Sequence, residues 1–423
     1  MATLERPKLR PVSARRADHQ GREVVALEDP LGVAEALAFP IDGMVHRVVR
    51  HFDGRATLPE IQVRVLRDTG QVVSTAELEA LIEQLDRALM LDGPAFAAHR
   101  AAYRAQGVRP AAHAGRAYAG TERALRAQLG KFFADPGGAG SPADPPDGAP
   151  RSPLRGVLSP HIDFTRGGPT YTWAYKELIE RSDADTFVIL GVAHQPCAHR
   201  FALTRKDFET PLGLARTDRA FVDRLAALAG GHLFDDELAH RTEHSVEFQV
   251  VFLQHLLGGK RDFAIVPILA GSFHDLMEAG ADPMADPEVR RFVEALRAAE
   301  SASPGKVAYI GGVDLGHIGP EFGDADPVDD ATLGRLERFD AAMLGHAAAA
   351  DPAGWFAEAA AVQNRWRVCG LAATYTMLRA MGPARGTLLR YDRAVDPART
   401  CCVSFASMAF EPIETAIESP TDA

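Results

Sequence analysis

The chain has 423 residues, of which 46% are hydrophobic and 24% are charged. That length suits two or three domains with their own cores, and the composition excludes a disordered or fibrous protein. Acidic residues outnumber basic ones, 57 to 46, and the formal net charge of -11 argues against a nucleic-acid surface spread over the molecule. We find neither a signal-peptide core nor an apolar run of the roughly 18 residues that span a membrane. We therefore expect a cytoplasmic protein that does not enter membranes.

Cysteine usage supports a reducing compartment. The chain has four cysteines, Cys197, Cys369, Cys401 and Cys402, and the last two are adjacent. Adjacent cysteines rarely form a structural disulfide. Cys401 and Cys402 have the pattern of strand residues.

Residues 22–96 read as a small, self-contained module. Val24, Val25 and Leu27 indicate a strand. Thr57 with Glu60, and Ser74 with Glu77, have capping-box spacing, and each pair precedes apolar residues at helical intervals. Residues 90–96 could form a terminal strand or wing. We expect a winged-helix-like domain, and its apolar pattern with the Phe52-Asp53-Gly54 turn resembles PqqD-like peptide-recognition domains.

Residues 135–153 hold six prolines and four glycines and look like a linker. After them, short runs rich in Val and Ile alternate with helical patterns. The expected strands are Gly156–Ser159, 186–190, 263–269 and 307–310, and the expected helices are 172–181, 220–229, 246–257 and 287–299. Val403, Phe405 and Ser407 alternate and suggest a closing, antiparallel strand. This order predicts an α/β fold with a largely parallel or mixed sheet flanked by helices.

Three of the four expected strands end at a histidine. His161, His194 and His317 follow the first, second and fourth strands. In open α/β sheets, ligands bind beyond the carboxyl ends of the strands. Such histidines often only bond a neighbouring carbonyl group, but three at one edge favour a metal site, because neutral imidazole suits Fe, Cu, Zn and Ni.

An anionic ligand would complete that site. The carboxylate candidates are Asp163, Asp314, Glu243 and Glu247. Cys369 is more specific, because it stands at the start of an expected helix, where backbone N-H groups and the helix dipole favour the thiolate. The alternative is an inert buried cysteine. Cys197 follows His194 by three residues in a polar loop, and we leave it out of the site.

The segment Glu243-His244-Ser245-Val246-Glu247 opens another expected helix. His244 and Glu247 are three apart and share a helix face, so His244 could orient a ligand or the substrate. The zinc-peptidase motif needs a second histidine four residues away and does not occur in this segment.

Five short motifs occur in the order and spacing of the Memo family, also called AmmeMemoRadiSam system protein B. They are S-P-H at 159–161, L-G-V-A-H at 190–194, E-H-S-V-E at 243–247, D-L-G-H-I-G at 314–319 and V-C-G at 368–370. The sequence R-P-A-A-H-A-G-R-A-Y at 109–118 is similar to the H-A-G-x-x-Y opening of that family. The resemblance covers about residues 107–410. It therefore divides the chain into domains 1–105 and 106–423 and makes residues 135–153 a loop within the second.

The resemblance implies a fold and metal-site layout like those of class III extradiol dioxygenases. By position, His161, His194 and Cys369 match the metal ligands, and His317 matches the acid/base of the related dioxygenases. His244 matches a further site histidine, and we add Asp314 to the expected catalytic residues. The implied metal is Fe(II) or copper, with zinc possible, and the implied partners are radical SAM and AMMECR-type proteins.

The chain departs from the family at positions beside the ligands. It has Ile162-Asp163-Phe164 after His161 where the family commonly has A-G-Y, and Gln195 where the family commonly has a second histidine. Metal binding therefore remains expected, whereas an inherited substrate does not. We expect a redox or oxygenase-like enzyme. The alternatives are a non-catalytic metal- or peptide-binding protein and a zinc hydrolase with the same ligands.

Overall fold

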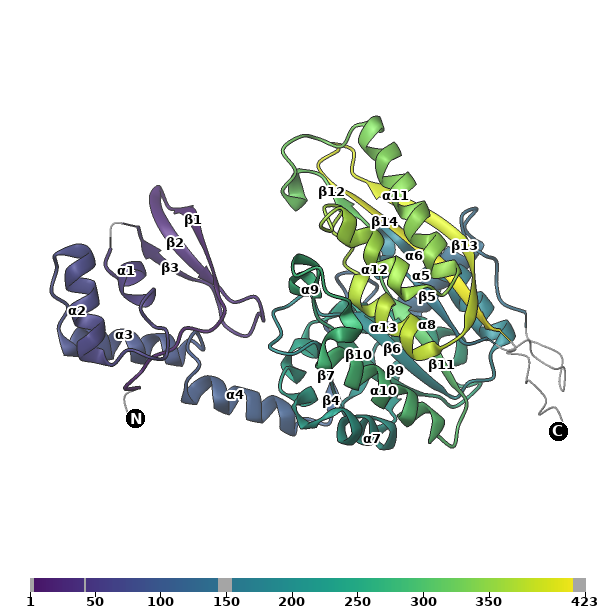
Figure 1. Ribbon diagram of the computed structural model, residues 1–423, viewed down its shortest axis with the longest axis horizontal. Helices are drawn as coiled ribbons and strands as arrows, with labels where there is room; N and C mark the ends of the chain where they lie inside the picture. Colours follow the sequence, from purple (N-terminus) through teal and green to yellow (C-terminus); the bar gives the residue numbers. More distant parts are fainter. Residues whose placement is uncertain (1–3, 42, 144–153, 414–423) are drawn as a thin grey trace, which may run out of the picture. The chain divides into compact units, whose positions relative to one another are not determined.

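The computed structural model describes residues 4–41, 43–143 and 154–413, and it divides the chain into two compact units, Met1–Gln106 and Gly107–Ala423 (Figure 1). Within the described ranges, none of the helices is both long and apolar enough to cross a membrane.

In its described residues, the N-terminal unit contains a three-stranded antiparallel sheet and four helices. The elements are β1 (Ser13–His19), β2 (Arg22–Glu28), β3 (Leu37–Pro40), α1 (Val45–Val49), α2 (Leu58–Thr69), α3 (Thr75–Arg87) and α4 (Pro94–Ala105). Both predicted capping boxes are confirmed, at Thr57–Glu60 before α2 and at Ser74–Glu77 before α3. They begin amphipathic helices whose apolar faces are buried in the core of this unit.

The terminal strand or wing predicted at residues 90–96 is wrong. Leu91 makes only an isolated bridge to Leu9, and the chain enters α4 at Pro94. Proline suits the first helical position, because its missing N-H would have no partner there. Phe96 and Tyr103, seven residues apart, are the buried residues of α4, which is helical spacing rather than strand spacing.

The C-terminal unit is built on one mixed sheet. Its strands run in the order β12-β14-β5-β11-β6-β10-β9-β8-β4, with β13 beside β14 and β7 beside β10. Their bounds are β4 (Val108–Arg109), β5 (Gly156–Ser159), β6 (Thr186–Val192), β7 (Phe201–Leu203), β8 (Asp207–Thr210), β9 (Gly213–Thr217), β10 (Ala264–Ala270), β11 (Val307–Gly312), β12 (His317–Ile318), β13 (Ala384–Val395) and β14 (Cys402–Pro412). The central strands β5, β11, β6 and β10 are parallel, and β14 closes against β5 in the antiparallel direction, which confirms the predicted α/β fold.

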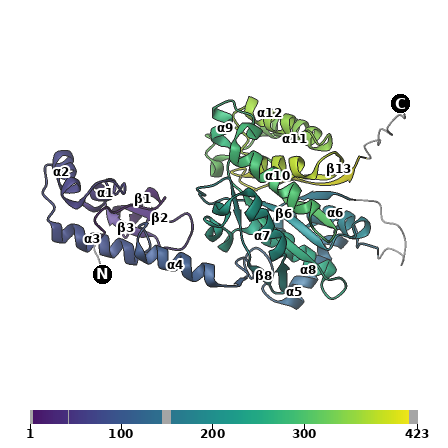
Figure 2. The same ribbon diagram turned by 60° about the horizontal axis from the view of Figure 1, so that its bottom comes forward.

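Helices cover both faces of this sheet. One face packs against α7 (Arg219–Ala229), α10 (Pro287–Ser301), α11 (Asp330–Ala348), α12 (Pro352–Ala361) and α13 (Leu371–Met381). The other packs against α5 (Glu122–Ala134), α6 (Phe164–Arg181) and α8 (His244–Leu257). Figure 2 shows α11 and α12 on one side and α5 and α8 on the other. The short helix α9 (His274–Glu278) follows β10. Because both faces are covered, the central strands β6 and β10 are apolar apart from Thr186.

One predicted helix, α6, begins well before its expected start. The start of α6 was predicted at residue 172, but Asp163 caps the helix and Phe164 is its first residue. The sequence does not predict this start, because the first turns contain Gly167, Gly168 and Pro169, and glycine and proline have low helix propensity. Burial of the first turns compensates, since Phe164 and Tyr171 are fully buried. Residues 135–143 contain no helix or strand, and the rest of the predicted loop lies outside the described residues.

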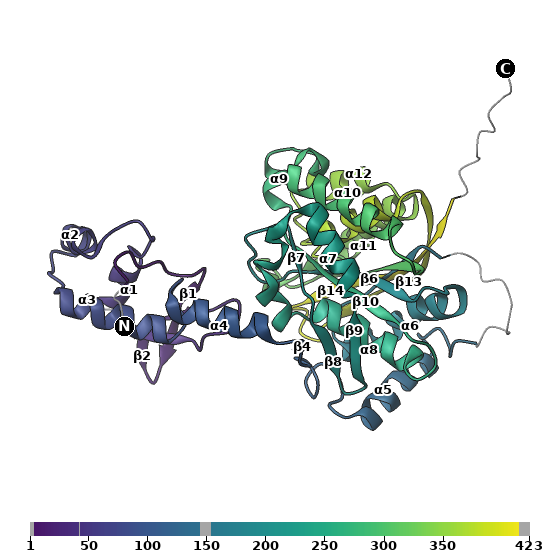
Figure 3. The same cartoon turned by 90° about the horizontal axis from the view of Figure 1, so that it is seen from below.

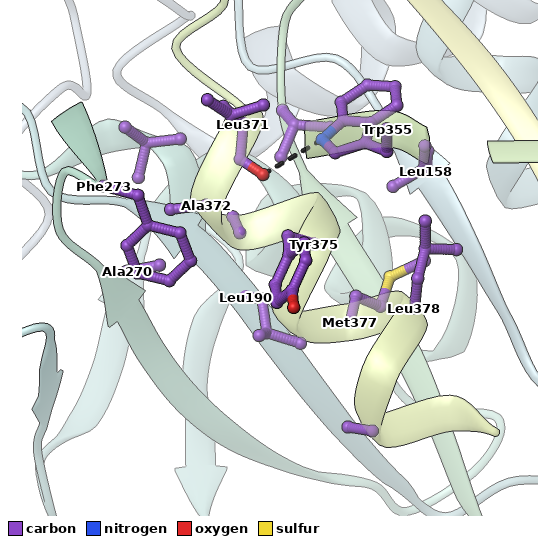
Figure 4. Close-up of a cluster of buried hydrophobic side chains, with 14 of the residues drawn as sticks. Leu158, Leu190, Ala270, Phe273, Trp355, Leu371, Ala372, Tyr375, Met377 and Leu378 are labelled. Atoms are coloured by element: carbon purple, nitrogen blue, oxygen red, sulfur yellow. Dashed lines mark hydrogen bonds between the residues drawn. The ribbon is translucent and has the colours of Figure 1, made fainter. Parts of the chain in front are cut away.

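The strands β5, β11 and β6 lie inside the sheet, between β4 at one end and β12 and β13 at the other. Figure 3 shows β6 and β10 between β4 and β13. Behind them, α13 packs against the sheet through Tyr375, Met377 and Leu378, which meet Leu158 and Leu190 from the strands (Figure 4). The indole N-H of Trp355 donates a hydrogen bond to the carbonyl of Leu371, at 3.0 Å. This packing holds the N-terminus of α13 against the carboxyl ends of the strands.

Candidate metal centre

Strand order brings three predicted site residues together. β11 lies between β5 and β6, and all three strands are parallel, so their carboxyl ends share one edge. His161, Asp314 and His194 each stand two residues beyond β5, β11 and β6, respectively. Three chain segments, one of them more than 100 residues from the other two, thus deliver two imidazoles and a carboxylate to one place.

Cys369 reaches this place from the chain just before α13. Gly370 makes the approach possible: a Cβ atom there would lie 2.6 Å from the Cβ of Val313 and 2.8 Å from the carbonyl oxygen of Asp314. The N-H of Gly370 bonds that same oxygen at 3.3 Å. Cys369 Sγ consequently lies 3.3 Å from His161 Nε2.

The donor atoms of His161, His194 and Cys369 all lie within 4.8 Å of one another, so one ion could contact all three. The two imidazole rings are 5.0 Å apart and nearly perpendicular. Two nitrogen donors and one sulfur donor are a set that suits zinc, iron or copper rather than magnesium or calcium.

Hydrogen bonds orient both imidazoles for this role. His161 Nδ1 lies 2.8 Å from the carbonyl oxygen of Gly312, so Nδ1 carries the hydrogen and Nε2 keeps its lone pair toward Cys369. His194 Nδ1 lies 3.1 Å from the carboxylate of Glu243, which leaves Nε2 of that ring as the donor. A carboxylate behind a ligating histidine is a common feature of metal sites. The residues therefore fit a metal ion.

Glu243 is fixed where β6 meets α8. It is the N-cap of α8 and accepts the N-H groups of His244 and Ser245. Ser245 Oγ bonds both the N-H and the carbonyl of Val192 at the end of β6. Burial would raise the pKa of Glu243, but bonds from His194 and the helix N-terminus lower it below its usual range. Glu243 is therefore a carboxylate at neutral pH.

The ionisable groups of the centre perturb one another, although they differ in burial: His161 and Asp314 are buried, Cys369 is half-buried and His194 is partly exposed. Burial would raise the pKa of Cys369, yet His161 and His194 lower it to about 7. Burial would lower the pKa of His194, yet Cys369 and Glu243 raise it to about 10. Burial raises the pKa of Asp314 to about 6 despite the neighbouring His317. Groups with strongly shifted pKa values that cluster at the carboxyl ends of strands are typical of functional sites.

Asp314 and His317 lie beside the predicted ligands. Asp314 Oδ1 accepts the N-H of His161 at 2.9 Å, and Oδ2 lies 3.7 Å from His161 Nε2. His317 Nδ1 faces the carbonyl oxygens of Leu315 and Arg367, at 3.0 and 3.1 Å, so its Nε2 is free to accept a proton. Burial lowers the pKa of His317, while Asp314 opposes this shift.

A model of Memo-like proteins matches residues 109–409, well over half of the chain and all of the residues just described. The chain belongs to the Memo family. It is 25% identical to a MEMO1 family protein of Aquifex aeolicus, in an alignment that covers 91% of this chain and 95% of the relative. It is 29% identical to one of Thermus thermophilus (80% and 94% covered) and 30% identical to one of Methanopyrus kandleri (68% and 93% covered). The predicted family is confirmed.

His244 also lies in this Memo-family site. Its ring stacks on His194 at 4.8 Å between centroids and meets His161 edge-on at 5.1 Å. His244, His194 and Glu243 form a second group that could hold a metal ion, although Glu243 is already bonded to the N-terminus of α8. Burial lowers the pKa of His244 well below its usual value.

Sequence reasoning left two residues out of the expected site. His113, in the opening motif of the Memo domain, packs edge-on against His244 at 5.8 Å, and its Nε2 bonds the carbonyl of Thr242. The motif that carries His113 was visible in the sequence. Glu243 was one of four carboxylate candidates, and the signal that separates it is its position immediately before α8.

The other candidates do not reach the centre. Asp163 caps α6 and pairs with Arg166. Glu247 is fully buried against Arg109 and the hydroxyl of Tyr118, so it faces away from His244 despite the helical spacing. Cys197 lines a cavity with His194, and burial raises the pKa of its thiol to about 12.

Proposed function

We propose that the Memo-like domain holds one redox-active metal ion, Fe(II) or copper, through His161, His194 and Cys369 and acts as an oxygenase-like or redox enzyme. The observation that carries the proposal is the convergence of the three donor atoms within 4.8 Å, with Nδ1 of each histidine engaged elsewhere. A bound ion would polarise a substrate oxygen or exchange electrons with it.

The residues around the ligands supply proton transfer and positioning. His317 donates Nδ1-H to backbone carbonyls, and its free Nε2 can take a proton from a substrate. Asp314 keeps His161 in place through the His161 N-H. The four cysteines are unpaired, which supports the proposal of a reducing, cytoplasmic location.

Metal analysis of protein purified without air tests the ligand assignment. The full chain is compared with His161→Ala, Cys369→Ser and the matched control His274→Ala, whose exposed imidazole pairs with Glu278 outside the centre. We expect the control to retain iron or copper and both site variants to lose it. Equal iron or copper content in all four proteins would overturn the assignment.

The identity of the metal separates the proposed chemistry from the runner-up. The same three ligands suit zinc with a bound water, which would indicate a hydrolase. Iron or copper changes its absorption or its electron paramagnetic resonance signal when reduced and reoxidised, whereas zinc does not. A centre that holds only zinc would exclude the redox proposal and favour hydrolysis.

A further inference from the structure

A second group of potential metal ligands lies outside the centre described above. His199 lies in the loop between β6 and β7, His232 in the short helix η1 (Gly231–Phe234), and Glu288 in the first turn of α10. Their donor atoms also lie within 4.8 Å of one another. We propose that these residues form a second divalent-metal site, suited to zinc. The proposal does not depend on the function of the first centre.

The distances within this cluster match a coordination shell better than a hydrogen-bond network. Glu288 Oε1 lies 3.5 Å from His232 Nε2 and 4.0 Å from His199 Nδ1. Both separations exceed those of good N-H···O bonds. Ligands about 2.1 Å from a tetrahedral zinc ion lie about 3.4 Å from one another, so the 3.5 Å pair fits directly and the 4.0 Å pair needs a small closure. The two rings are 4.4 Å apart.

Surrounding contacts position Glu288 and His199. Glu288 Oε1 accepts the N-H of Arg200 at 2.8 Å, and the N-H of His199 bonds Asp236 at 2.9 Å. Asp235 Oδ2 lies 3.7 Å from His199 Nε2, on the ring edge opposite Nδ1. That distance is too long for a hydrogen bond, but the negative charge near Nε2 favours the hydrogen on that nitrogen and leaves the lone pair on Nδ1.

The local charge and exposure also suit a cation. The guanidinium of Arg200 pairs with Asp275 and Asp286, and Arg200 contacts Glu288 through its backbone N-H. The side chains of His199, His232 and Glu288 are 30%, 29% and 27% exposed, so an ion can reach them from solvent.

Two residues of this cluster line a cavity that also includes His194 of the first centre. His194, Cys197, His199 and Glu288 line one cavity of about 640 Å³. A zinc ion with two histidines and one glutamate keeps an open position for water or another ligand. A ligand at this open position, if it faces the cavity, would lie near His194. The loop 193–200 carries residues of both metal sites, His194 and His199.

Zinc titration of the chelator-treated full chain tests the proposal, with zinc as the only added ligand. We expect two equivalents of zinc to bind to the wild type and to the control His274→Gln, which changes an exposed histidine. One equivalent should bind to the double variant His199→Gln/His232→Gln. Glu288→Gln keeps an acceptor for the Arg200 N-H and should still lose the same equivalent. Circular dichroism and the unfolding midpoint show which variants are folded. Two equivalents in a folded double variant or in Glu288→Gln would overturn the second site.

Cobalt distinguishes failure of this site from failure of the proposed function. Co²⁺ at the first centre gives a thiolate-to-metal charge-transfer band from Cys369, whereas a His/His/Glu site gives none. In Cys369→Ser we expect the band to vanish and one equivalent to remain, and adding His199→Gln/His232→Gln should remove that equivalent. If Cys369→Ser keeps both equivalents while the His199 and His232 changes remove one, the ligand role of Cys369 fails and the second site stands.

Discussion

Replacing Glu243 by Gln should weaken metal binding at the first centre without disturbing α8. The glutamine oxygen can still accept the N-H groups of His244 and Ser245, but the negative charge behind His194 is lost. Glu243 is only 3% exposed, so water screens that charge poorly. Loss of such a partner typically costs 10- to 100-fold in affinity, or about 1.4 to 2.8 kcal/mol.

The assay is competition for Co²⁺ against a chromophoric chelator, followed by the thiolate band so that the Cys369 centre alone is measured. Asp163→Asn is the matched control, because Asp163 also caps a helix through two N-H groups but faces Arg166. We expect the control to bind like the wild type. A Glu243→Gln dissociation constant within twofold of wild type would refute the idea that Glu243 tunes His194.

Three further predictions concern stability and are measured by urea unfolding. Leu190→Ala, in the core shown in Figure 4, should lower the free energy of unfolding by about 2 to 5 kcal/mol. Leu228→Ala, at a half-exposed position, should change it by less than about 1 kcal/mol. Equal effects would contradict the packing of Leu190 in the core. Arg109→Met leaves the buried Glu247 without its cationic partner and should lower the free energy of unfolding by about 3 to 5 kcal/mol, and adding Glu247→Leu should restore much of the loss. A neutral single variant would contradict the buried pair. Burial lowers the pKa of His240 to about 4, so the unfolded chain takes up a proton between about pH 6.5 and pH 4 that the folded chain does not. The free energy of unfolding should therefore fall by about 3 kcal/mol as the pH is lowered from 6.5 to about 4, and this fall should be smaller in His240→Gln. An equal pH dependence in His240→Gln and the wild type would show that another group dominates.

Much of the fold was predictable because its signals are local. Both capping boxes, the four central strands and the closing strand β14 follow from residue type and spacing within about ten residues. Predictions failed where tertiary burial overrode local preference. At residues 90–96, apolar residues resembled a strand but lead into α4, and at Gly167 to Pro169 poor helix formers are held in α6 by the core around them.

The sequence by itself determined the Memo family, the α/β class and the types of side chain that the strands deliver at their ends. Only the tertiary structure decided how those side chains combine. The order in which β5, β11 and β6 lie side by side puts Asp314 between His161 and His194, although Asp314 follows them by more than 100 residues. The meeting of α8 with β6 decided that Glu243, rather than Glu247, supports His194. Sequence spacing shows which face of one element two residues share, whereas contacts between elements depend on the packing of the whole sheet.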